Sequence, residues 1–227
     1  LFGGRQPVAH VNIHPMDVIY DKEVRKYAYD PQKAEALLDE AGWKKAKDGF
    51  RYNDKGEKLQ FRLMTTAGNR SRELVQQAIQ SDWGKIGVQT VLKNETARVL
   101  FGETTRMRKF DDGVMYAWMS APKNIPRTTL HSSMIPSAEN NYAGQNYPGF
   151  KNAEADQVLD DLERVCAPDK NMALWKRIQA IYAEELPALP LYYRANSFIV
   201  PKWLKGIRPT GHQDPSTLWV EEWRREP

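Results

Sequence analysis

Strand and helix patterns alternate between residues 59 and 118, and this constrains the fold of the 227-residue chain more than any other feature. Leu59, Phe61 and Leu63 alternate with polar residues, as in a strand with one buried face. Over residues 69–86 apolar side chains recur at three- and four-residue spacing, which is the period of a helix with one buried side. This stripe consists of Leu74, Val75, Ala78, Ile79, Trp83 and Ile86.

The same alternation continues further along the chain. Residues 88–92 predict another strand, residues 96–107 a helix and residues 113–118 a third strand. Such an order predicts an α/β domain with a mixed, largely parallel sheet flanked by helices. Ligands of open α/β sheets bind at the carboxyl ends of the strands, which here lie near Thr65 and Trp118.

The clearest single helix lies between Asp30 and Gly42. Asp30 can cap its N-terminus, Pro31 suits its first turn because the missing N–H would be unpaired there, and Gly42 favours its end. One side of the helix is apolar, with Ala34, Leu37, Leu38 and Ala41. The spacing predicts an amphipathic helix whose charged side faces water.

Composition indicates a folded protein, and it argues against a membrane span and against a nucleic-acid partner. Seven Trp and ten Tyr residues supply aromatic surface for a core. No run of about 18 apolar residues is present, so no membrane span is predicted. The net charge of +4 is interspersed with acidic residues, unlike the basic stripe of a nucleic-acid binder. Residues 1–5 do not resemble a signal peptide, and we expect the chain to be a piece of a longer protein.

Patterns for catalysis or metal binding are weak. Glycine-rich phosphate loops, Gly-x-Ser-x-Gly and His-Glu-x-x-His are all absent from the sequence. His10 and His14 have a spacing seen in metal sites, but Pro15 and the lack of a third ligand favour a structural role. We therefore expect no catalytic residue, no metal and no cofactor. Cys166 continues an apolar helical stripe and is predicted to be buried and unreactive.

Three segments resemble a known family. They are Tyr-Asp-Pro-Gln-Lys-Ala-Glu-Ala-Leu-Leu-Asp-Glu-Ala-Gly-Trp at 29–43, Gln-Gln-Ala-Ile-Gln-Ser-Asp-Trp-Gly-Lys-Ile-Gly-Val at 76–88, and Glu-Leu-Pro-Ala-Leu-Pro-Leu-Tyr at 185–192. In this order they are similar to the extracellular solute-binding proteins of family 5, which are the peptide, oligopeptide and nickel receptors of ABC importers.

The resemblance implies the C-terminal lobe of such a receptor, with a periplasmic-binding-protein-like fold. Residues 1–25 would connect it to another lobe, 26–200 would form the ligand-binding lobe, and 201–227 would return toward the first lobe. The function implied is capture of a peptide-like or other small polar solute in a cleft between lobes, without catalysis. The implied partner is an ABC permease, and the implied receptor is monomeric and exported to the periplasm or the outer face of the cytoplasmic membrane.

Two loops supply the candidate ligand-binding residues. The loop after Leu63 faces the cleft in the family, and residues 119–150 are rich in Pro, Asn, Ser and Gly, which is typical of a functional loop. The candidates are Thr65, Thr66, Asn69, Arg70, Trp118, Ser120, Lys123, Asn124 and Arg127. Asn69 is equally well explained as a helix cap, and Trp118 as a core residue.

The sequence departs from the family where peptide-binding members place an Asp that pairs with the ammonium terminus of the peptide. Ala121 occupies that position, and Lys123 adds positive charge nearby. A buried ammonium without a carboxylate partner is unfavourable. Either the ligand lacks a free amine or carries an acidic group that meets Lys123 or Arg127, or another lobe supplies the Asp.

Two alternatives remain open at this point. Residues 119–150 could serve a hydrolase or transferase, although no positioned nucleophile supports this. The chain could also be a pure interaction module.

Overall fold

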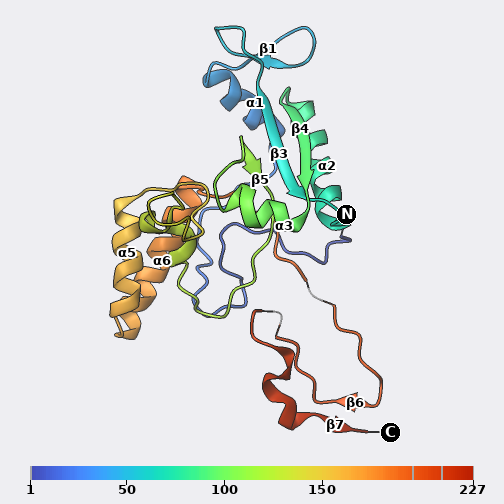
Figure 1. Ribbon diagram of the computed structural model, residues 1–227, viewed down its shortest axis with the longest axis vertical. Coiled ribbons are helices and arrows are strands. Elements are labelled where there is room, and N and C mark those ends of the chain that lie inside the picture. The colour runs from blue at the N-terminus through green and yellow to red at the C-terminus, as the bar shows by residue number, and fades with distance from the viewer. Residues whose placement is uncertain (1, 196, 211, 227) are drawn as a thin grey trace. The chain divides into compact units, whose positions relative to one another are not determined.

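The computed structural model describes residues 2–195, 197–210 and 212–226, and the chain divides into two compact units (Figure 1). Unit 1 contains residues 27–117 and 133–149. Unit 2 contains residues 2–26, 118–132 and 150–226. The segment expected to form one lobe therefore contributes to both units.

Unit 1 is built on a three-stranded parallel sheet, which confirms the predicted α/β class. The strands are β3 (Gln60–Thr66), β4 (Gln89–Glu95) and β5 (Gly113–Val114), in the order β4-β3-β5. β3 and β4 pair along their whole length, from Gln60 opposite Gln89 to Thr66 opposite Glu95. β5 is shorter than predicted, and its Gly113 lies so close to Phe61 that a Cβ there would be 2.7 Å from the ring.

One long helix, α2 (Arg70–Lys85), connects β3 to β4 and packs against both strands (Figure 1). Asn69 caps it by accepting a hydrogen bond from the Arg72 N–H. Trp83 packs edge-on against Phe61 of β3 with 5.1 Å between ring centroids. The helix predicted over 69–86 is thus confirmed, because its apolar stripe matches the face of the sheet that it covers.

The helix predicted over residues 96–107 takes a different form. A single turn, α3 (Ala97–Val99), is followed by a π-helical segment, η1 (Leu100–Thr105). The Thr105 hydroxyl is buried and donates to the Leu100 carbonyl, 2.9 Å away and five residues earlier. An inward-facing threonine that bonds at this spacing fits the wider π turn, and apolar periodicity alone cannot reveal such a turn.

The first helix of unit 1, α1 (Pro31–Glu40), packs beside a small hairpin of β1 (Lys44–Lys45) and β2 (Arg51–Tyr52). None of its residues is buried, and Leu37 is 54% exposed. Arg51 is buried instead, and its guanidinium donates to Asp39 of the helix at 2.8 Å. Polar contacts therefore fix a helix that its sequence pattern marks as amphipathic.

Unit 2 has a separate core around two adjacent helices, α5 (Ala153–Arg164) and α6 (Pro168–Glu185) (Figure 1). The short helix α4 (Arg127–Leu130) and the turn η2 (Ser132–Met134) precede them. The N-terminal segment adds four buried side chains to this core, Val11, Ile13, Ile19 and Val24. Residues 2–26 are therefore an integral part of unit 2.

One expectation for unit 2 is wrong. Cys166 is exposed, because α5 ends at Arg164 and Val165 is extended, so the helical stripe stops before the cysteine. The described residues of the run 189–200 form no strand, and only Tyr192 makes an isolated antiparallel bridge, to Val8.

The C-terminal segment of unit 2 contains little regular structure. It has β6 (Leu204–Lys205), which pairs antiparallel with β7 (Arg224–Arg225), and the 3-10 segment η3 (Ser216–Glu222). Across the described part of the chain, no helix combines the length and the apolar character needed to cross a membrane.

Candidate functional site

The carboxyl end of β3 is buried and tightly hydrogen-bonded. The Thr65 hydroxyl donates to the Met115 carbonyl at 2.7 Å, and the Thr65 N–H donates to the Asn94 side chain at 3.2 Å. The Thr66 hydroxyl accepts a hydrogen bond from the Arg72 guanidinium at 2.8 Å. Both candidate threonines therefore use their hydroxyls within unit 1.

A buried glutamine supports this end of the sheet. Gln76 of α2 is 1% exposed, and its amide donates to the Leu63 carbonyl at 2.6 Å and to Asn94 at 2.8 Å. At the end of β4 the Glu95 carboxylate accepts from the Thr104 hydroxyl at 2.6 Å. This network fixes the carboxyl end of the sheet, where α/β proteins bind ligands. The sequence patterns did not single out Gln76, Glu95 or Thr104.

Asn69 and Arg70 follow the same strand in the loop that begins α2. Asn69 acts as the helix cap, since its side chain accepts from the Arg72 N–H at 3.1 Å. Arg70 is exposed, and the described residues offer it no hydrogen-bond or ion-pair partner. Of the four candidates in unit 1, Arg70 is the one whose polar group remains available to a solute.

An aromatic cluster lies near β5 within unit 1. Tyr116 packs edge-on against Phe101, with 5.7 Å between ring centroids, and against Tyr147 at 6.3 Å. Burial raises the pKa of the Tyr147 phenol, so this ring stays neutral. Phe101 and Tyr116 are partly exposed and offer apolar area for a ligand, whereas Tyr147 is buried. Nothing in the sequence spacing of these rings indicates that they meet.

The remaining candidates belong to unit 2. Trp118, Ser120, Lys123 and Asn124 are exposed, and Trp118 has half of its surface accessible. The Ser120 carbonyl accepts a hydrogen bond from the Gln213 N–H at 3.3 Å, which ties this loop to the C-terminal segment. These four exposed side chains therefore lie within seven consecutive residues, 118–124.

Arg127 is held by acidic residues of α5. Its guanidinium lies 2.5 Å from the Asp160 carboxylate and 3.5 Å from that of Glu163. The hydrogen bond to Asp160 raises the pKa of Arg127 and lowers the pKa of Asp160. A guanidinium paired in this way is less available to an acidic ligand than an unpaired cation.

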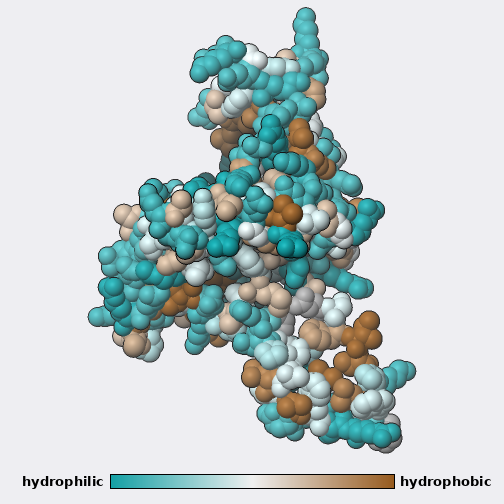
Figure 2. Space-filling model, viewed as in Figure 1, coloured by the Kyte–Doolittle hydropathy of each residue, from teal (hydrophilic) through white to brown (hydrophobic). Residues whose placement is uncertain are grey.

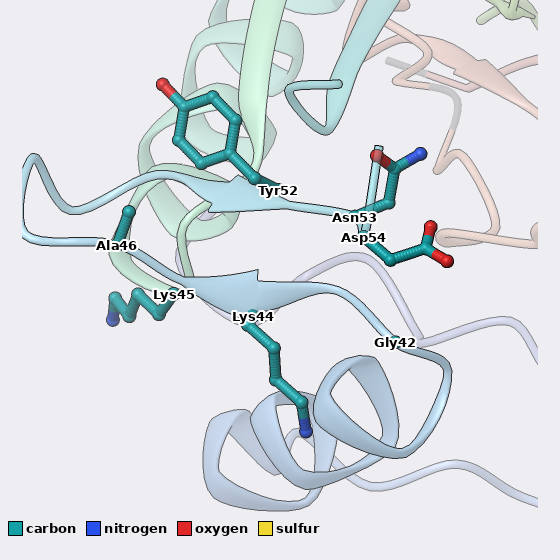
Figure 3. A pocket seen from close by; sticks show the side chains of 7 residues that line it. All are labelled: Gly42, Lys44, Lys45, Ala46, Tyr52, Asn53 and Asp54. Carbon is teal, nitrogen blue, oxygen red and sulfur yellow. The ribbon is translucent and has the colours of Figure 1, made fainter. Parts of the chain in front are cut away.

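A shallow pocket of about 470 Å³ lies beside the hairpin of unit 1 (Figure 3). Its lining contains none of the nine candidates and includes Lys44, Lys45 and Tyr52. These three groups bond within the protein, to the Asp39 carbonyl, to Glu35 and to Asp48. The three polar groups that line the pocket are therefore already paired within the protein, which argues against the pocket as a second candidate site.

The two N-terminal histidines lie apart from any cluster of metal ligands. The His14 imidazole accepts from the Met16 N–H at 3.1 Å and packs edge-on against Tyr193. Among the residues that the structure describes, no group of three or more His, Cys, Asp or Glu side chains could hold a metal ion.

Residues 1–141 match the family model of bacterial extracellular solute-binding proteins, family 5 middle region. Among curated proteins, the oligopeptide-binding protein AppA of Bacillus subtilis is 29% identical over 223 residues. That alignment covers 97% of this chain and 39% of AppA. The chain therefore spans about two fifths of the length of this relative.

Solved structures give the same result for the fold. An oligopeptide-binding protein from Thermus thermophilus, complexed with a pentapeptide, is 37% identical with a TM-score of 0.81, covering 89% of this chain and 36% of that protein. NikZ from Campylobacter jejuni, in complex with Ni(L-His), is 28% identical with a TM-score of 0.77, covering 97% and 44%. The fold is thus that of periplasmic binding proteins, and the ligands of these two proteins differ in chemistry.

Proposed function

The chain belongs to the bacterial extracellular solute-binding proteins of family 5, and from this premise we propose that it is the C-terminal lobe of the substrate-binding component of an ABC importer. The observation that carries the proposal is the family match over residues 1–141, together with the 37% identity to a pentapeptide-bound receptor. The receptor captures a solute in a cleft between lobes and delivers it to a membrane permease.

The ligand in this proposal is a peptide-like or other small polar solute. The names of the relatives support this class, since they include oligopeptide- and dipeptide-binding proteins. The exposed candidates Arg70, Ser120, Lys123 and Asn124 supply polar contacts, and Trp118 supplies a ring for stacking. Thr65, Thr66 and Asn69 fix the backbone of unit 1 next to Arg70 through their hydrogen bonds. Arg127 would serve more weakly, through its paired guanidinium.

A second part of the proposal concerns the ends of the chain. We propose that residues 1–25 connect to the first lobe of the receptor and that residues 201–227 return to it. The C-terminal segment exposes apolar surface (Figure 2): Trp203, Leu218 and Val220 are each about half exposed, and Ile199, just before the segment, is 98% exposed. Apolar surface of this extent is typical of a face that packs against protein.

We also propose that the receptor is exported, acts as a monomer outside the cytoplasmic membrane, and has no catalytic activity. Membership in a family of extracellular solute-binding proteins supports export and argues against the hydrolase or transferase alternative. Incubation of the full-length receptor with generic ester, phosphate and peptide substrates tests the last point. Turnover above that of the buffer would contradict it.

Native mass spectrometry of the full-length receptor, purified without denaturation, tests the main proposal. We expect a bound small molecule of defined mass that is lost on denaturation. Calorimetry with that molecule should give much weaker binding to residues 1–227 alone, because half of the cleft would be missing. Equal affinities of the chain and the full-length receptor would contradict a cleft between lobes.

A further inference from the structure

A strained turn in unit 2 carries one of the exposed candidates. The Asn124 N–H donates to the Ala121 carbonyl at 3.2 Å, which closes a four-residue turn with Pro122 second and Lys123 third. Lys123 has a φ of +55°. Proline followed by a left-handed residue is the pattern of a type II turn, in which the third position normally holds glycine or asparagine. A lysine is unfavourable there because of its Cβ.

A carboxylate from a distant part of the sequence holds this turn. Asp17 accepts a hydrogen bond from the Lys123 backbone N–H at 2.8 Å through one oxygen, and one from the Ile19 N–H at 3.3 Å through the other. Ile19 is 3% exposed and belongs to the core of unit 2. The position of Asp17, and through it the conformation of Lys123, is therefore set by core packing.

The Lys123 side chain is exposed, and it is the backbone N–H of this residue that bonds to Asp17. The Lys123 ammonium makes no ion pair with a carboxylate of the described residues. Asp17 bonds to the Lys123 backbone N–H and not to the ammonium. Arg127, four residues later, is paired with Asp160. Backbone strain that the surrounding structure maintains at an exposed charged residue indicates a functional role more readily than a structural one.

We propose that Lys123 is the anchor for an acidic group of the ligand, and that Asp17 is the residue that positions it. This inference rests on the proposed function, and it narrows the ligand class to solutes that carry a carboxylate or a similar anion. The backbone that carries Lys123 is already fixed, so the ligand does not have to order a flexible loop. A hydrogen bond between two charged groups would add both affinity and selectivity.

The test compares two peptides that differ only in charge. Acetylated pentaalanine with a free carboxylate and its C-terminal amide are titrated into the full-length receptor by calorimetry. We expect the acid to bind roughly tenfold more tightly than the amide, as a charge-assisted hydrogen bond implies. Equal affinities for the two peptides would overturn the inference and leave the proposed function standing.

Variants of Lys123 separate its charge from its conformation. Lys123→Asn and Lys123→Gly suit the left-handed position and remove the ammonium, so they should raise Tm and abolish the preference for the acid. Lys123→Arg keeps the charge and should keep most of the preference. The matched control Lys151→Asn, an exposed lysine elsewhere in unit 2, should leave the preference unchanged. A preference that survives in Lys123→Asn would overturn the assignment.

Variants of Asp17 test the positioning role. Asp17→Ala removes both acceptor oxygens and should reduce the ratio of acid to amide affinity. Asp17→Asn keeps one oxygen, which can still accept from the Lys123 N–H, and should preserve more of the ratio than Asp17→Ala. General damage to the fold would weaken both peptides equally, so an unchanged ratio in Asp17→Ala would contradict the positioning role. If neither peptide binds and the receptor co-purifies with no solute, the proposed function itself fails. A co-purified solute without an acidic group would overturn only this inference.

Discussion

Two amphipathic helices of this chain, α1 and α5, have similar lengths and are fixed by opposite kinds of contact. α5 buries Ala155, Val158, Leu159 and Leu162, whereas α1 buries no residue. α1 is attached through Asp39, which the buried Arg51 contacts at 2.8 Å. An apolar stripe therefore permits burial without requiring it, since the neighbouring elements decide whether there is a surface to pack against.

The largest effect on the free energy of unfolding should come from a substitution that removes apolar packing of α5. Leu159 is fully buried, so Leu159→Ala should lower the free energy of unfolding by about 2–5 kcal/mol, through lost burial and the cavity left behind. Urea unfolding followed by circular dichroism measures this change. A loss below about 1 kcal/mol would show that α5 contributes little more packing energy than α1.

A smaller but clear effect should come from removing the polar clamp of α1. Arg51→Met keeps an apolar stem but leaves the carbonyls of Trp43 and Ile86 without the guanidinium that now donates to them, each at 2.7 Å. We expect a loss of about 1–3 kcal/mol in the free energy of unfolding, as for unsatisfied buried polar groups. Arg51→Lys, the matched control, keeps the charge but not the fork of donors, and should recover only part of the loss.

Ion pairs in unit 2 should make its stability depend on pH. The hydrogen bond from Arg127 lowers the pKa of Asp160, and the one from Arg177 lowers the pKa of Glu154. Because both folded pKa values lie below the unfolded ones, the stabilisation is present at neutral pH and is lost as the pH falls below about 4. The urea midpoint should fall between pH 7 and pH 3, and it should fall less in Asp160→Asn. An equal fall in wild type and variant would contradict this role.

The smallest effect should come from the apolar stripe of α1 itself. Leu37 is 54% exposed, so Leu37→Gln should change the free energy of unfolding by no more than about 0.5 kcal/mol. The measurement is again urea unfolding, compared directly with Leu159→Ala. A loss of several kcal/mol would indicate that Leu37 packs against protein in solution and that the contrast between α1 and α5 is false.

Much of the secondary structure could be predicted because its signals are local. Asp30 and Asn69, which the sequence suggests as helix caps, each accept a backbone hydrogen bond at the start of a helix. The period of residues 59–63 and 69–86 likewise placed β3 and α2 correctly. Capping and periodicity act over a few residues, so the sequence contains the whole signal.

The candidate site was harder to predict, because its features depend on residues far apart in the chain. The sequence suggested candidate residues but not their hydrogen-bond partners: the Thr65 hydroxyl bonds to Met115, and Arg127 pairs with Asp160. The contact between Asp17 and Lys123 joins residues 106 positions apart. No spacing pattern contains such a pair.

The sequence by itself determined the α/β class, the order of the main helices and strands, and the family. These depend on local caps, on periodicity and on short motifs, which survive in any part of the chain that is read alone. Tertiary structure decided which amphipathic faces are buried, where Arg51 and Cys166 lie, that Leu100–Thr105 widens into a π-helix, and that Lys123 is held in a left-handed turn. The physical reason is that burial and strain depend on the free energy of contacts between distant segments, which local propensity does not include.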